Sequence, residues 1–101
     1  MTDTLKMLAR GALGDSLASL YATPVDKKTI VKNILLCNTD SAARTVTISI
    51  EGVAIVSSHE IEANDTLVIP LSTIMESEDA LSGEASVDAV VNYYLSGIEV
   101  G

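Results

Sequence analysis

The chain has 101 residues, of which 48% are hydrophobic, and its fourteen acidic and six basic side chains give a net charge of −8. This length predicts one domain with a single core. The acidic excess excludes nucleic acid as an expected partner, because affinity for phosphate backbones comes from clustered Lys and Arg. We also expect no membrane partner, since nowhere do eighteen apolar residues follow one another. Cys37 is the single cysteine, so no internal disulfide can form and a reducing compartment is indicated.

Residues 4–20 allow two interpretations. A helix would align five leucines in a stripe: Leu5, Leu8, Leu13, Leu17 and Leu20. Gly11 and Gly14 would each weaken that helix by roughly 1 kcal/mol relative to Ala. We therefore predict an extended N-terminal arm over residues 1–14, followed by one sandwich domain over residues 15–101, with a short helix as the alternative. Such an arm would lie either on the domain's own sheet or on a neighbouring subunit.

The clearest local signal is a β-hairpin over residues 45–56. Polar and apolar residues alternate strictly from Thr45 to Ile50, and β-branched side chains suit a pleated surface. Glu51 and Gly52 then form the expected two-residue turn, because Gly tolerates the positive φ that such a turn requires. The hairpin therefore anchors an all-β interpretation of the chain.

The register of this hairpin predicts which residues face outward. The expected cross-strand pairs are Ile50 with Val53 and Ile48 with Ile55. Ala54 and Val56 would then point away from the core. In the preceding strand, Leu35 and Cys37 would share the outer face as well, so that both faces of a thin sandwich carry apolar groups.

Further strands and turns follow from similar patterns. The strands are expected over residues 20–23, 29–37, 45–50, 53–56, 59–62, 67–69, 80–86 and 87–100. Pro70 should end its strand, and the spacing of Thr73 and Glu76 predicts a capping box that opens one helical turn. Gly97 offers a bulge that would turn Ile98 and Val100 onto the core. The count predicts an all-β fold, an antiparallel β-sandwich of about eight strands that is jelly-roll-like.

Residues that could carry chemistry are few. His59 is the only histidine and is interpreted as a polar strand residue. The acidic clusters around Glu60 and Glu76 lack EF-hand spacing and are interpreted as a solvated rim. We therefore expect no catalytic residue, no metal, no cofactor and no enzymatic activity.

Six segments resemble small β-sandwich virion structural proteins of tailed bacteriophages, a group of accessory, decoration, tail or fibre-associated components. These segments are Leu20-Tyr21-Ala22-Thr23-Pro24, Lys28 to Ile34, Cys37-Asn38-Thr39, Ala43 to Ile48, Ile61 to Leu67, and Tyr94 to Glu99. The resemblance implies a protein that self-associates, with a homotrimer as the leading stoichiometry, and that attaches to other phage virion proteins of the capsid or tail. It also implies location in the virion, after assembly in the host bacterial cytoplasm.

The resemblance and the outward apolar positions together predict an oligomer or virion interface. Its expected residues are Leu5, Met7, Leu8, Leu13, Leu35, Cys37, Ala54 and Val56. The alternative is a carbohydrate or host-receptor binding module of a phage tail, in which loops 38–43 and 76–83 and the ring of Tyr94 would bind a surface glycan.

Overall fold

The computed structural model of the chain describes the backbone of residues 3–101 and the side chains of residues 6–101. Eight strands account for most of it: β1 (Asp3–Ala12), β2 (Ala18–Ala22), β3 (Lys28–Asn38), β4 (Arg44–Ile50), β5 (Val53–Ile61), β6 (Thr66–Met75), β7 (Ala80–Ala85) and β8 (Val91–Val100). Within the described residues no helix is long and apolar enough to cross a bilayer.

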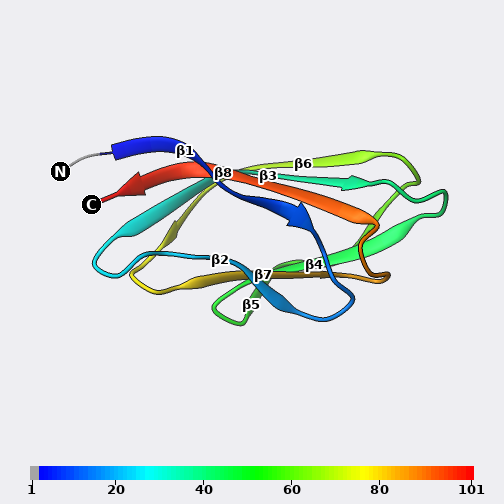
Figure 1. Ribbon diagram of the computed structural model, residues 1–101, viewed down its shortest axis with the longest axis horizontal. Helices are drawn as coiled ribbons and strands as arrows, with labels where there is room; N and C mark the ends of the chain where they lie inside the picture. The colour runs from blue at the N-terminus through cyan, green and yellow to red at the C-terminus, as the bar shows by residue number, and fades with distance from the viewer. Residues whose placement is uncertain (1–2) are drawn as a thin grey trace.

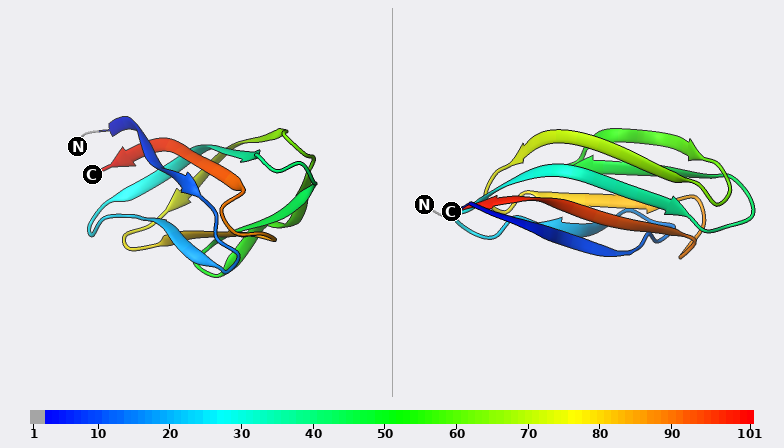
Figure 2. Two further views of the ribbon diagram at one scale, coloured as in Figure 1. Left: turned by 45° about the vertical axis from the view of Figure 1, so that its right-hand side comes forward. Right: turned by 90° about the horizontal axis from the view of Figure 1, so that it is seen from above.

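The strands form two stacked antiparallel sheets of four (Figure 1). Sheet A has the order β1-β8-β3-β6, and sheet B has the order β2-β7-β4-β5. Figure 2, right, looks onto sheet A and shows its four strands in this order. Strand 1 thus pairs with 8, 2 with 7, 3 with 6 and 4 with 5, as if one long hairpin were rolled up with the β4–β5 turn as its tip. This is the order of an eight-stranded jelly roll, which confirms the predicted fold class.

The tip of this rolled hairpin is the turn predicted from the sequence. Glu51 and Gly52 have φ angles of 48° and 78°, which is the backbone of a type I′ turn. The carboxylate of Glu51 also accepts a hydrogen bond of 2.7 Å from the backbone N–H of Ala80, and its own N–H donates to the Ala80 carbonyl at 3.0 Å. The tip is therefore fixed to the first residue of β7.

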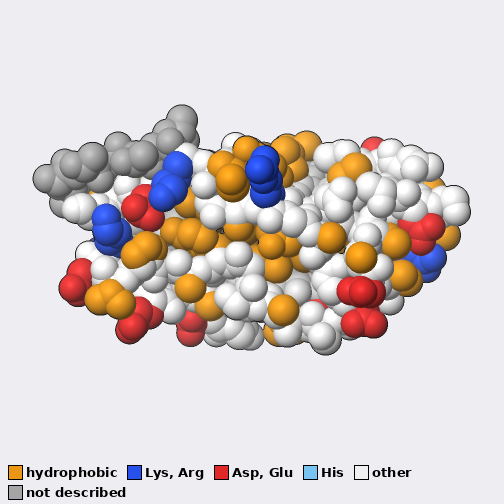
Figure 3. Space-filling view, viewed as in Figure 1, with side chains coloured by type: hydrophobic (Ala, Val, Ile, Leu, Met, Phe, Trp, Pro, Cys, Tyr) orange, Lys and Arg blue, Asp and Glu red, His pale blue; other side chains and the backbone are white. Residues whose placement is uncertain are grey.

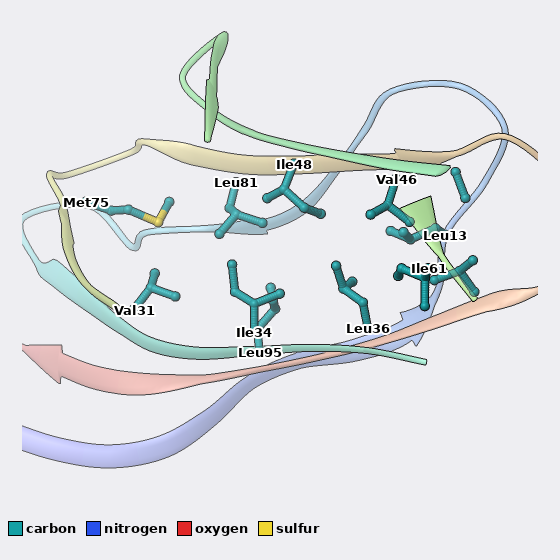
Figure 4. Close-up of a cluster of buried hydrophobic side chains, with 12 residues drawn as sticks. Leu13, Val31, Ile34, Leu36, Val46, Ile48, Ile61, Met75, Leu81 and Leu95 are labelled. Atoms are coloured by element: carbon teal, nitrogen blue, oxygen red, sulfur yellow. The ribbon is translucent and has the colours of Figure 1, made fainter. Parts of the chain in front are cut away.

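Aliphatic side chains from the inner faces of both sheets fill the core (Figure 4). The largest fully buried members are Leu13, Ile34, Leu36, Ile48, Met75, Leu81 and Leu95. Each side chain of this size contributes about 1.5 to 3 kcal/mol when it is removed from water. The core therefore needs no Trp or Phe, and the chain contains neither.

The N-terminal segment is extended, as predicted, but it is not separate from the sandwich. Strand β1 pairs with β8 from Asp3 opposite Val100 to Ala12 opposite Asn92. Leu13, which follows β1 directly, is fully buried. Residues 3–14 therefore belong to the domain, and of the two surfaces proposed for the arm it lies on its own sheet. The helical alternative is wrong.

Strand β5 corrects the predicted register of the hairpin. Ile50 lies opposite Val53 as expected, but Ile48 lies opposite Val56, and the register shifts between these two pairs. Ile55 is the extra residue of a β-bulge, and it is exposed. The bulge turns Val56 toward the core, where it packs half-buried against the central cluster.

Strand β6 continues through Pro70 to Met75, so the helical turn predicted after Pro70 is wrong. Pro70 is tolerated because β6 is an edge strand, where a residue without an N–H breaks no ladder on its free side. The spacing of Thr73 and Glu76 fits a capping box only in a chain that is free to turn. Here Thr73 pairs with Val31 of β3 instead.

The bulge predicted at Gly97 lies on the neighbouring strand. Gly97 and Ser96 are consecutive in the β8 ladder, whereas β3 skips Lys32 between Val31 and Asn33. Gly97 faces the core, and a Cβ there would collide with the carbonyl oxygen of Ile30. The side chains after Gly97 therefore continue to alternate between the two sides of sheet A, and Ile98 stays on the outer side.

Candidate functional site

The outer side of sheet A carries two rows of paired side chains that cross the sheet. One row is Arg10, Tyr94, Leu35 and Val68, and the other is Ile98, Ile30 and Ile74. Neighbours within each row are cross-strand partners, so their side chains stand side by side. We call these seven residues the sheet A face.

Four large apolar side chains of the sheet A face are open to solvent. The exposed fractions are 60% for Ile74, 55% for Val68, 39% for Tyr94 and 36% for Leu35. Single exposed apolar residues are ordinary, but contiguous ones mark surfaces that bind something. The jelly roll thus covers one side of sheet A with sheet B and leaves an apolar strip on the other.

A shallow hollow of about 500 Å³ lies in the first row, between Arg10 on β1 and Leu35 on β3. Tyr94, Asn92 and Cys37 complete its lining. Figure 3 shows the molecule from the side of strands β1 and β2, with sheet A at the top. Hydrophobic side chains surround a basic side chain in this upper part. The hollow is therefore an apolar depression with one cationic group at its margin.

Charge divides unevenly between sheet A and the rest of the chain. The strands of sheet A contain four of the six basic residues and two of the fourteen acidic ones. One of these acids, Glu99, lies near Lys6 at 3.6 Å and Lys27 at 3.7 Å. Arg10 forms no ion pair with any other residue that the structure describes, and Lys32 reaches only the hydroxyl of Ser72, at 3.0 Å. By the strand register, Arg10 and Lys28 lie on the outer side of sheet A, and Lys32 lies at the β3 bulge. Lys28 is 3.6 Å from Glu76, so Arg10 and Lys32 are the basic groups that this side offers to a partner.

Three of the predicted interface residues lie on the outer side of sheet A. Leu35 is central in the first row, Cys37 is half-buried beside it, and Met7 is 40% exposed opposite Ser96 of β8. Leu5 also pairs through its backbone with Ile98, but its side chain lies outside the described residues.

The other four predicted interface residues lie elsewhere. Leu13 is fully buried, while Leu8 and Val56 pack half-buried against the core. Leu8 turns inward because β1 has a register shift between Met7 and Ala9. Ala54 is exposed opposite Ser49, on the outer side of sheet B and away from the other candidates. The predicted interface residues therefore lie in three places: the outer side of sheet A, the core, and the outer side of sheet B.

Val68, Ile74 and Ile98 belong to the sheet A face but were not predicted. Burial alternates residue by residue along Thr66–Met75 in the structure, but the apolar run Leu67-Val68-Ile69 shows no such alternation in the sequence. Val68 and Ile74 occupy exposed positions of the alternation in the structure. The expectation that the strand stops at Pro70 left Ile74 out.

The loops of the carbohydrate alternative lie at opposite ends of the sandwich. Loop 38–43 follows the last residue of β3, whereas loop 76–83 follows Met75, which pairs with Thr29 at the start of β3. The length of β3 separates them by about 30 Å at 3.3 Å per residue. Tyr94 lies between the two ends, so the structure does not gather these three parts into one site.

Loop 38–43 is held by polar contacts of its own. Asn38 is fully buried and donates from its amide to the carbonyls of Ala42 and Ile61 at 2.9 and 3.0 Å. The guanidinium of Arg44 and the N–H of Ser41 donate to the carboxylate of Asp40, which lowers the pKa of Asp40 below its usual value. These contacts close the loop.

His59 is exposed on β5, and Cys37 lies on sheet A. Among the described residues, no three side chains of His, Cys, Asp or Glu come together closely enough to hold a metal ion.

No family model matches the chain, and no curated protein matches it in sequence. Solved structures match its fold. A chain from the acidic stable capsid structure of Helicobacter pylori bacteriophage KHP30 aligns with all of this chain and 89% of its own length, with a TM-score of 0.60 and 12% identity. A chain from the T13 IBDV viral particle aligns with 97% of this chain at a TM-score of 0.60 and 6% identity, and this chain spans only 30% of it. At such identities the likeness shows a shared fold.

Proposed function

We propose that the chain is a non-enzymatic structural protein of a bacteriophage virion, which self-associates and attaches to the capsid or tail as an accessory component. The observation that carries this proposal is the sheet A face, where paired rows of apolar side chains remain open to solvent on a sandwich whose core is complete without them.

The size of the face suits a protein contact. The four strands of sheet A, each of about ten residues, have a flat outline of about 600 Å², because strands lie about 4.8 Å apart and extend about 3.3 Å per residue. A standard protein interface buries about 800 Å² per partner. Covering the apolar part of such a face would release roughly 2.5 kcal/mol for every 100 Å² removed from water. The outer side of sheet A, which contains the seven residues of the sheet A face, is therefore large enough to supply most of one specific interface.

The fold and the sequence resemblance support the setting. The fold is similar to that of chains from two virus particle structures, and one of these is a chain of similar length from a bacteriophage capsid structure. Jelly rolls serve both capsid and lectin roles, so the fold alone does not choose between them. The resemblance to tailed-phage virion proteins favours the structural role, with a homotrimer as the proposed stoichiometry and the virion as the location.

The direct test is quantitative mass spectrometry of purified particles of the phage that carries this gene. We expect the chain in many copies per particle, and its absence from purified particles would contradict the proposal. The docking surface is tested by the variant Leu35→Ser/Val68→Ser, which should be depleted from particles at least tenfold. The matched control Leu17→Ser/Val25→Ser removes two apolar side chains of the same types from loops, where they are somewhat more exposed, and should be incorporated normally.

A second function, glycan binding, is favoured by one observation. Tyr94 exposes its ring in a hollow that also contains the side chains of Arg10 and Asn92, and aromatic faces with nearby polar groups suit sugar rings. A glycan array would show a binder that Tyr94→Ala abolishes. Normal incorporation into particles together with an array without any binder would eliminate this function.

A further inference from the structure

We propose that the self-contact is heterologous: the sheet A face of one copy packs against the β5 edge of the next. The β5 edge comprises Val53, Ile55, Glu60 and Glu62. This inference rests on the self-association in the proposed function and names the two surfaces that meet.

The β5 edge is the second exposed apolar strip of the molecule. Val53 is 66% exposed and Ile55 is 41% exposed, the latter because the bulge pushes it out of the ladder. Glu60 and Glu62 are exposed at the far end of the strand, and neither carboxylate forms an ion pair with another described residue. The β5 edge thus carries apolar groups at one end, Val53 and Ile55, and carboxylates at the other, Glu60 and, just after the strand, Glu62.

The two surfaces are complementary in apolar character and in charge. The sheet A face offers apolar rows with Arg10 and Lys32 beside them, and the β5 edge offers apolar residues with carboxylates. A symmetric contact of face with face would bring cations together, and a contact of edge with edge would bring carboxylates together. Of these three contacts, the face-to-edge contact is the one that joins opposite charges, and like charges across an interface are costly.

Pairing of sheet edges through backbone hydrogen bonds is disfavoured in this fold. Strand β5 has two register shifts against β4, and strand β6, on the same side of the sandwich, contains Pro70 and a shift of its own. Bulges and proline are the devices that prevent edge strands from extending a sheet into a neighbour. The contact is therefore one of side chains, which charge reversal can test.

The test uses charge reversals, with the assembled fraction followed by light scattering over a concentration series. Arg10→Glu/Lys32→Glu alone, and Glu60→Lys/Glu62→Lys alone, should each raise the concentration for half-assembly at least tenfold, because each creates like-charge contacts. The fourfold variant that combines both pairs reverses both surfaces, so it should assemble within about threefold of the wild-type concentration.

A matched control separates local complementarity from net charge. The variant Arg10→Glu/Lys32→Glu/Asp15→Lys/Asp88→Lys has the same net charge as the wild type, and its two compensating changes lie in exposed loops and are not among the residues of either surface. We expect it to stay unassembled, and its assembly would show that only net charge matters and would overturn the proposal.

Two other outcomes of the charge reversals would refute the proposed contact. Assembly unaffected by Arg10→Glu/Lys32→Glu would indicate a symmetric contact or another surface, and a fourfold variant that stays monomeric would remove the β5 edge as the partner surface. In either case the chain can still be abundant in purified particles, so the inference would fail while the proposed function stands. Absence of the chain from particles would instead refute the proposed function itself.

Discussion

Replacing Gly97 with Ala should damage the domain severely, because the new methyl group has no space. A Cβ at Gly97 would overlap the carbonyl oxygen of Ile30 and lie 3.2 Å from Cδ1 of Leu8. A backbone carbonyl cannot move aside as a flexible side chain can, so β3 must separate from β8 near Val31. Overpacking costs about 1 to 3 kcal/mol, and two weakened backbone hydrogen bonds add about 1 kcal/mol each. We therefore expect a loss of about 3 to 5 kcal/mol.

Chemical and thermal denaturation of Gly97→Ala would measure this loss. For a domain of this size the melting temperature should fall by about 12 °C or more. Gly14→Ala is the matched control, because a Cβ there would come no closer than 3.5 Å to any neighbour, and its effect should stay within about 1 kcal/mol. A Gly97→Ala variant as stable as the wild type would show that β8 is not in the described register. The assignment of Ile98 to the sheet A face would then be wrong as well.

Two further predictions concern loop 38–43. Asn38→Leu should lower the free energy of unfolding, measured in urea, by about 2 to 4 kcal/mol, because it removes the amide that donates to the buried carbonyl of Ile61. The control Asn33→Ala, at an exposed position of the same strand, should lower it by less than about 0.5 kcal/mol. Equal effects of the two changes would contradict this. Asp40→Asn should destabilise the domain at pH 7 but not in acid. A carboxyl whose pKa is lowered in the folded state contributes stability above its ordinary pKa of about 4, and this stability is lost as the pH falls through the lowered value. A stability difference between wild type and Asp40→Asn that stays the same from pH 7 to pH 2 would refute this.

The parts of the fold that depend on local sequence were predictable. The alternation from Thr45 to Ile50 and the turn at Glu51 and Gly52 determine the central hairpin, because both signals act within a few residues. The sandwich class followed from the same kind of pattern. The count of eight agrees only in number, because the predicted strands 53–56 and 59–62 are both part of β5 and β1 was expected to be an arm. The extended form of the N-terminal segment was predictable too, since two glycines disfavour a helix.

The parts that depend on a partner strand were not predictable. Whether Val56 faces inward is decided by the bulge at Ile55, which exists only once β4 and β5 are paired. Gly97 seemed suited to a bulge, yet the extra residue belongs to β3, at Lys32. A single sequence does not say which of two paired strands accommodates the additional residue. The predicted interface contained the core residue Leu13 because residues 1–14 were expected to form an arm, and it omitted Ile74 because the strand was expected to end at Pro70.

The central claim is that the open apolar face makes this domain part of an assembly. Light scattering coupled to size exclusion, on the wild-type chain at tens of micromolar, tests that claim most directly. We predict a mass that is a whole multiple of the 10.6 kDa of one chain, with three as the proposed multiple, and a shift to smaller mass for Leu35→Ser/Val68→Ser. A wild-type mass of 10.6 kDa at every concentration would contradict the account.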